Sequence, residues 1–246
     1  MDTTKTSNPD ETIRIRRIQR PDIPIMAQIA ATAYLYSDLN NFLCPYRFTY
    51  LNDYTHRFVQ MIRARYFNPR CIGFVAVCSS NPNIPVGYAQ FIRLGNDEAA
   101  RRLIAAQSSF WQTLQGWCVG IWTWIEKLIW PDRSTDNEAL RKFMAMAEID
   151  DQRFWESPEM REKYGNRWHA QSVVVSEAFE RRGIGRRLMG EVLQRAQREG
   201  VVVGLEASED GEKLYRALGF ELRGRFNMTL GSGGGGIMMW TPEEKL

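Results

Sequence analysis

One stretch near the C-terminal end constrains the fold of this chain more than any other. It runs from Trp168 to Phe220 and starts with a β-rich run that ends at Val175. A turn follows, then the triplet Gly183-Ile184-Gly185 and an amphipathic helix with apolar residues every three or four positions. Where a glycine turn opens a helix, backbone N–H groups stay unpaired and the helix dipole favours negative charge. The stretch therefore predicts a phosphate or pyrophosphate site.

The charge of the turn supports this prediction, although a short glycine motif alone does not decide it. Arg181, Arg182, Arg186 and Arg187 surround the turn and add fixed positive charge. The alternative is an ordinary strand–turn–helix with a solvated basic face. Two other glycine motifs are excluded, because the chain has no P-loop string and Leu188 stands where a Rossmann fingerprint needs its third glycine.

Two motifs in the stretch resemble the GNAT superfamily of acetyl-CoA-dependent N-acetyltransferases. Residues 180–185 read E-R-R-G-I-G, which is similar to the family pattern Q/R-x-x-G-x-G/A except that Glu180 takes the first place. Residues 214–220 read L-Y-R-A-L-G-F and resemble the family ending L-Y-x-x-x-G-F. The resemblance implies an α/β GNAT fold, with a mixed central sheet of about seven strands that is flanked by helices and splayed between the fourth and fifth strands.

The resemblance also implies where acetyl-CoA binds. The cofactor would lie between the fourth strand (168–175) and the fifth (201–206), with its pantetheine arm on main-chain atoms of the fourth strand and its pyrophosphate on the glycine turn. The cofactor-binding residues expected on this basis are Val173, Val174, Val175, Arg181, Arg182, Gly183, Ile184, Gly185, Arg186 and Arg187.

Acetyl transfer to an amine needs a base for the amine, a donor for the oxyanion and an acid for the leaving thiolate. Tyr215 is the expected acid, because a tyrosine pKa of about 10 exceeds that of a thiol, about 8.5. The Val173 N–H is the expected oxyanion donor. His169 and Glu206 are rival bases, and a relay through water is a third possibility. The alternative interpretation makes Tyr215 a core aromatic and His169 a packing or surface residue.

The remainder of the chain fits one domain. Residues 1–11 are polar and are expected to form a disordered arm, and residues 12–246 are expected to form a single GNAT domain. Hydrophobic periodicity predicts strands over 13–16, 72–77 and 86–92 and helices over 25–36 and 54–66. Beyond the glycine helix, strands are predicted over 220–230 and 237–240, joined by the glycine-rich residues 231–236.

Residues 95–167 form a long insertion between the third and fourth strands. Residues 110–130 hold five of the eight tryptophans, and their apolar positions recur at helical spacing. We expect a helix that packs its apolar face on the core, with a lid over an apolar acceptor pocket as the alternative. Polar residues interrupt the segment too often for a membrane span, and its polar face lacks the basic residues of a membrane-surface helix.

Composition limits the partners. The net charge of +3 does not argue for nucleic acid. Cys44, Cys71, Cys78 and Cys118 form no CxxC pair and only two histidines are present, so no metal site is expected. The polar start lacks the apolar region of a signal peptide, which favours a cytoplasmic protein without a membrane partner. A monomer or a homodimer is expected.

These observations predict an N-acetyltransferase that transfers an acetyl group from acetyl-CoA to a primary amine of a small molecule. Two alternatives stay open: a GNAT-fold module that binds acyl-CoA without catalysis, and an N-acetyltransferase of proteins or peptides.

Overall fold

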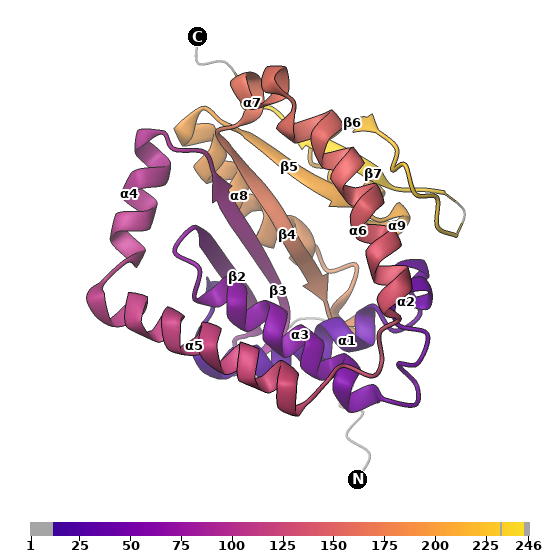
Figure 1. Cartoon of the computed structure of the whole chain (residues 1–246). Helices are drawn as coiled ribbons and strands as arrows, with labels where there is room; N and C mark the ends of the chain where they lie inside the picture. The colour runs from indigo at the N-terminus through magenta and orange to yellow at the C-terminus, as the bar shows by residue number, and fades with distance from the viewer. Residues whose placement is uncertain (1–11, 232, 244–246) are drawn as a thin grey trace.

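The computed structural model describes residues 12–231 and 233–243, so the predicted N-terminal arm lies outside the described residues. The described chain forms a seven-stranded sheet in the order β1-β2-β3-β4-β5-β7-β6 (Figure 1). Helices cover both faces of the sheet, which confirms the predicted α/β GNAT-like architecture. The strands are β1 (Ile13–Arg17), β2 (Cys71–Cys78), β3 (Asn81–Leu94), β4 (Arg167–Val175), β5 (Val202–Ala207), β6 (Glu221–Gly224) and β7 (Gly236–Trp240).

The strands β4 and β5 are parallel, whereas the other neighbouring strands pair antiparallel. Their register joins residues 167–170 to residues 202–205 and ends there, although both strands continue. Beyond Ala170 and Leu205 the two strands diverge, as Figure 1 shows. The predicted splay between the fourth and fifth strands is therefore confirmed.

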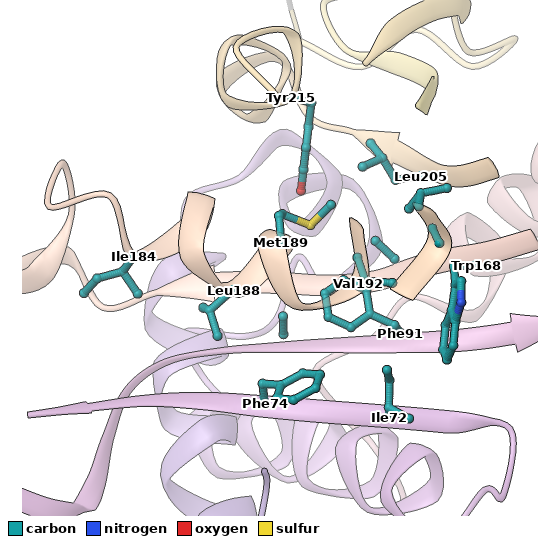
Figure 2. Packing of buried hydrophobic residues seen from close by; sticks show 14 of the residues in the cluster. Ile72, Phe74, Phe91, Trp168, Ile184, Leu188, Met189, Val192, Leu205 and Tyr215 are labelled. Atoms are coloured by element: carbon teal, nitrogen blue, oxygen red, sulfur yellow. The ribbon is translucent and has the colours of Figure 1, made fainter. Parts of the chain in front are cut away.

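On one face of the sheet lies α8 (Ile184–Glu199), whose buried positions recur with helical period. Its side chains Leu188, Met189 and Val192 pack among the inward residues of β2, β3, β4 and β5 (Figure 2). The helix α9 (Glu209–Arg216) contributes Tyr215 to the same cluster. This face holds the larger hydrophobic core and fixes the start of α8 beside the splay.

Two groups of helices cover the opposite face. The N-terminal group is α1 (Ile23–Ala33), α2 (Asp38–Leu43) and α3 (Leu51–Tyr66). The second group comes from the insertion: α6 (Asn137–Asp151), a π-helical turn (Gln152–Glu156) and α7 (Pro158–Tyr164). In Figure 1, β4 is visible between α3 and α6. The π-helical turn buries Trp155 against β5, where a Cβ on Gly204 would come within 2.5 Å of the indole. A glycine inside a strand here allows this close approach.

The two ends of the insertion are adjacent in the sheet, because Leu94 at the end of β3 is the register partner of Arg167 at the start of β4. Its first helices are α4 (Glu98–Gln107) and α5 (Phe110–Ile129), and α5 is the predicted tryptophan-rich helix. The prediction that α5 packs its apolar face on the core is wrong. Trp117, Trp124 and Leu128 are each at least 65% exposed, and α5 instead turns Glu126 inward against α3.

Two predicted strands also need correction. The strand predicted over 86–92 is longer, because β3 begins at Asn81 and ends at Leu94. The strand predicted over 220–230 ends at Gly224 as β6. In each case the outcome depends on a tertiary contact that local periodicity does not report.

Candidate active site

The predicted anion loop has the backbone shape that its sequence suggests. Gly183 is the N-cap of α8 with φ of 73°, and Arg181 also has a positive φ, 58°. The first intrahelical bond runs from the Arg187 N–H to the Gly183 carbonyl at 3.1 Å. The N–H groups of residues 184–186 precede that bond, so the helix supplies them no acceptor. Three aligned donors at the positive end of α8 suit a phosphate group.

The side chains of the loop divide into two groups. Arg181, Arg186 and Arg187 are exposed, which leaves their guanidinium groups accessible to an anion. Arg182 lies over the ring of Phe179, 5.4 Å from its centroid. The Ile184 side chain is 1% exposed and belongs to the core, so Ile184 can offer a ligand its backbone only.

The two glycines of the loop are required for different structural reasons. Gly183 needs its positive φ, and a Cβ there would meet open space. A Cβ on Gly185 would come within 3.0 Å of Leu214 on α9, so Gly185 allows α8 and α9 to pack closely. The two predicted motifs of the sequence are therefore in direct contact.

The fourth strand presents an open edge beside this loop. The Ser176 N–H donates to the Val86 carbonyl on β3 at 2.9 Å. Since successive N–H groups along a strand point to opposite sides, Val174 also faces β3, whereas Val173 and Val175 face the gap left by β5. The structure thus leaves the main-chain groups of Val173 and Val175 free toward the splay. Val174 turns its side chain into the core of the opposite face and keeps the strand in place.

Tyr215 is buried in the core of the α8 face, at 9% exposure. Its ring packs near Phe220, with centroids 5.6 Å apart, and its hydroxyl points from α9 toward Met189 on α8 (Figure 2). Burial is the main cause that raises the pKa of Tyr215, and the nearby Tyr34 and Glu206 raise it further. The hydroxyl therefore stays protonated at neutral pH and can act as a donor or as an acid.

His169 and Glu206, the two rival bases, lie in direct contact. The Nε2 atom of His169 is 2.7 Å from Oε2 of Glu206, where β4 and β5 begin to part. The Glu206 side chain is 43% exposed, whereas that of His169 is 13% exposed. The Nδ1 atom of His169 is buried and has no hydrogen-bond partner among the described residues. Of the pair, the Glu206 carboxylate is the group that an acceptor can reach.

The protonation of Glu206 is set by opposing effects. Partial burial raises the pKa of this carboxyl, but the charge and hydrogen bond of His169 outweigh burial, so the net shift is downward. The carboxylate therefore stays ionised at neutral pH. An ionised carboxylate at the splay can bind an ammonium group and accept its proton.

Two neighbours of this pair come from the insertion and were missed by the sequence reasoning. Trp155 meets the His169 ring edge-on, with centroids 5.6 Å apart. The pKa of Asp151 is raised by its partial burial and by the charge of Glu206. The one sequence signal for this contact was Gly204, an isolated glycine within a β-rich run, which indicates a close approach by another element.

A second group of polar side chains lies on the face of the sheet opposite α8, between β4 and the N-terminal helices. Ser172 Oγ lies 3.1 Å from Tyr88 Oη, and the pKa values of Tyr34 and Tyr88 are raised chiefly by burial. The Arg65 guanidinium lies near both rings, and burial lowers its pKa. With Gln90, Arg65 also lines a small hollow of about 50 Å³ at the C-terminal end of α3. These hydroxyls form a polar wall on the side where an acceptor would approach β4.

Comparison with known proteins identifies the domain. Residues 141–222 match the family model described as an acetyltransferase (GNAT) domain. This matched range includes both predicted motifs and the elements β4, β5, α8 and α9. The match confirms the resemblance to the GNAT superfamily over residues 141–222, about a third of the chain.

Three solved structures are similar to this chain. A structure described as histone acetyltransferase HPA2 and related acetyltransferase from Corynebacterium glutamicum has 16% identity and a TM-score of 0.58, and the match covers 95% of this chain and 98% of that one. NAA60 of Arabidopsis thaliana with a bisubstrate analogue has 13% identity, coverage of 93% and 95%, and a TM-score of 0.48. PaiA N-acetyltransferase of Thermoplasma acidophilum with coenzyme A has 9% identity, coverage of 94% and 99%, and a TM-score of 0.45.

At 16% identity the first of these structures shows a shared fold alone. No curated protein sequence matches the chain. Within the described residues, no group of three or more histidine, cysteine and acidic side chains could hold a metal ion. None of the described helices is long and apolar enough to cross a membrane.

Proposed function

We propose that this protein is an acetyl-CoA-dependent N-acetyltransferase whose acceptor is a primary amine of a small molecule. One observation carries the proposal: the anion loop, the open edge of β4, Tyr215 and the His169–Glu206 pair all converge on the point where β4 and β5 separate. This arrangement provides one group for each part of an acetyl transfer from a thioester.

Cofactor binding is assigned to backbone and basic groups. The pyrophosphate would lie on the N–H groups of residues 184–186, with Arg181, Arg186 and Arg187 as further positive charges. The pantetheine arm would pair with the main chain of Val173 and Val175. When bound, the cofactor supplies the activated acetyl group.

The residues of the site would then move the protons. Glu206 binds the ammonium of the acceptor and takes one of its protons, and the free amine then forms its bond to the carbonyl carbon. The Val173 N–H faces the splay and would donate to the carbonyl oxygen as it gains negative charge. As the C–S bond breaks, the nitrogen loses its second proton to water and Tyr215 gives its proton to the leaving sulfur. From Tyr215 alone this transfer is uphill, because the raised pKa of Tyr215 lies above the thiol pKa of about 8.5, so the transfer is completed as water returns a proton to the phenolate oxygen.

Within this mechanism His169 is a positioning residue. Its Nε2 holds Oε2 of Glu206, and its Nδ1 is buried, so it acts on the acceptor through Glu206. The ionised carboxylate also favours an acceptor that arrives as a cation, and Asp151 beside it adds to that preference.

The first test is thermal melting of the full chain with acetyl-CoA, CoA or ATP. A ligand that binds only the folded state raises the melting midpoint by mass action. We expect acetyl-CoA and CoA to raise it and ATP to leave it unchanged. No shift with millimolar acetyl-CoA would refute the cofactor assignment.

The acceptor is tested separately, by thiol release with a panel of amines. Small primary amines should release CoA in proportion to product, and peptides with free N-termini form the comparison arm. Release with peptides alone would make the acceptor a protein. A melting shift without release by any amine would favour the non-catalytic binding module.

A further inference from the structure

The helix α5 presents an apolar surface that the active site does not use. We define the tryptophan face as Leu114, Trp117, Ile121, Trp124 and Leu128, which are spaced three or four residues apart and are 43% to 71% exposed. No charged residue occurs from Leu114 to Ile125. The neighbouring Trp122, Ile129 and Trp130 are also at least half exposed. Soluble surfaces rarely expose apolar side chains in such a continuous strip.

The orientation of α5 is fixed by its opposite side. Glu126 is 9% exposed and faces α3, where it pairs with Arg63 and accepts from Gln60 at 3.4 Å. Arg63 also donates to Thr123 at 3.1 Å. Rotating α5 to bury its tryptophans would bring this buried carboxylate and Thr123 out of contact with α3. The outward tryptophan face is therefore what the sequence specifies.

The size of this face argues against a stable contact with a second copy through α5. A helix of 20 residues is about 30 Å long, and a strip about 10 Å wide gives roughly 300 Å². A stable protein interface buries about 800 Å² per partner. A convex strip on a single helix fits a flat, deformable partner better than a second rigid strip.

The charges of α4 and α5 indicate the charge that a flat partner would carry. Acidic side chains of α4 and α5 are paired: Glu98 lies in an ion pair with Arg102, and Glu126 with Arg63. Among the described residues, Arg101 and Lys127 are exposed basic side chains of these two helices that make no ion pair with an acid. The unpaired charge of these two helices is thus positive.

We propose that α5 lies in the surface of a lipid bilayer that contains anionic lipid, with the tryptophan face among the headgroups and Arg101 and Lys127 near the lipid charge. Tryptophan prefers the boundary between water and hydrocarbon, and an amphipathic helix at that boundary gains from apolar burial and from attraction to anionic lipid. The sequence argued against a membrane-surface helix because the polar side of α5 lacks basic residues. The structure shows that α3 occupies this side, so the positive charge comes instead from α4 and from one end of α5.

A label at Cys118 tests the proposal without altering the helix. Cys118 is exposed on α5, whereas Cys44, Cys71 and Cys78 are buried. A polarity-sensitive fluorophore attached to the native thiol should shift to shorter wavelength with vesicles of phosphatidylcholine and phosphatidylserine. The shift should be smaller with phosphatidylcholine alone. Flotation of the unlabelled full chain with the same vesicles provides a second readout.

Matched variants distinguish binding through the tryptophan face from non-specific binding through other exposed apolar side chains. Trp117→Ser, Ile121→Ser and Trp124→Ser combined should weaken the partitioning into vesicles at least about tenfold. The control Met144→Ser with Ile149→Ser removes exposed apolar side chains of α6 and should bind as the wild type does. Arg101→Gln with Lys127→Gln should lower binding to the anionic vesicles toward the level for phosphatidylcholine alone. Circular dichroism establishes that each variant is folded.

Two outcomes would overturn the proposal. One is wild-type protein that stays at the bottom of the flotation gradient with unchanged Cys118 fluorescence. The other is a dimer in analytical ultracentrifugation that the triple variant abolishes while vesicles bind neither protein, because the face would then join two copies.

Discussion

At the scale of single residues, the chemistry of the site depends on groups whose protonation is set by their neighbours. Tyr215 and Glu206 show opposite effects. Burial is the chief cause that holds the phenol protonated, and His169 keeps the carboxyl ionised against the effect of burial. Each group is therefore in the form that the proposed mechanism requires of it at neutral pH.

Replacing Tyr215 by Phe should lower kcat by about 10² to 10³, the usual contribution of general acid catalysis. The phenyl ring keeps the packing against Phe220, so the melting midpoint and its shift with acetyl-CoA should change little. Steady-state kinetics and thermal melting on the same preparation check both points. A kcat within twofold of the wild type would make Tyr215 a core aromatic.

His169 and Glu206 should respond differently to substitution. Glu206→Gln removes the group that meets the acceptor and should lower kcat/KM by about 10² or more. His169→Gln removes the positive neighbour, so the pKa of Glu206 rises toward or above its ordinary value and the acid limb of kcat/KM moves to higher pH. Profiles of kcat/KM against pH for both variants check this. An unmoved limb in His169→Gln would show that Glu206 does not control it.

The sequence named both members of this pair but did not predict their contact. His169 and Glu206 are 37 positions apart, and they meet because the parallel register places His169 opposite Gly204, two residues before Glu206. A sequence pattern locates strands, whereas their register depends on the packing of the whole sheet. The anion loop was easier to predict, because a glycine turn and a helix start are local features.

At the scale of elements, the insertion helices show where periodicity stops being informative. The spacing of the tryptophans correctly placed α5, and it correctly gave the helix one apolar face. It could not show which face meets the protein, because that depends on Arg63 and Gln60, more than 60 positions earlier in the chain. Trp155 was missed for the same reason, since its partner surface on β5 lies far along the sequence.

The junction after α5 is held to α3 by Asp53. Its side chain is 1% exposed, and it accepts from Arg133 Nε at 2.7 Å and from Trp130 Nε1 at 3.2 Å. The hydrogen bonds from Arg133 are the largest cause that lowers the pKa of Asp53 to about 2. This contact ties the end of the tryptophan helix to the body of the protein.

Replacing Asp53 by Asn should lower the melting midpoint by several degrees at pH 6. The pKa of Asp53 is lowered on folding, so its contribution is complete above the unfolded value of about 3.9 and is lost as pH falls toward about 2. The difference between wild type and variant should therefore shrink over that range. Melting curves between pH 2 and 6 check this, with Glu162→Gln on exposed α7 as the control. A constant difference across the range would contradict the assignment.

At the scale of the whole molecule, three hydrophobic clusters share one sheet. One lies under α8, one under the N-terminal helices, and the third joins Trp155 of the insertion to β5 and β7. The cluster under α8 shares β2, β3 and β4 with the second cluster and β5 and β7 with the third, so losing either of these two exposes a face of strands that support the cluster under α8. The insertion is thus part of a common core and not an appended unit.

We therefore predict that the chain unfolds in one cooperative step. Differential scanning calorimetry should show a single transition whose calorimetric and van't Hoff enthalpies agree. Acetyl-CoA should move the whole transition upward without splitting it. Two resolved transitions would mean that the insertion folds independently of the sheet, and the single-domain prediction would then be wrong.

The pairing of Leu94 with Arg167 has a consequence for how such a protein could change over evolutionary time. Since the chain leaves and rejoins the sheet at adjacent points, residues 95–166 can vary in length without moving any strand out of register. Within that one segment lie both the outward tryptophans and the inward Trp155 and Asp151. A single exchange of this segment could therefore change the proposed membrane surface and the neighbours of the proposed base Glu206 together. The residues proposed to bind the cofactor lie outside the segment and would stay the same.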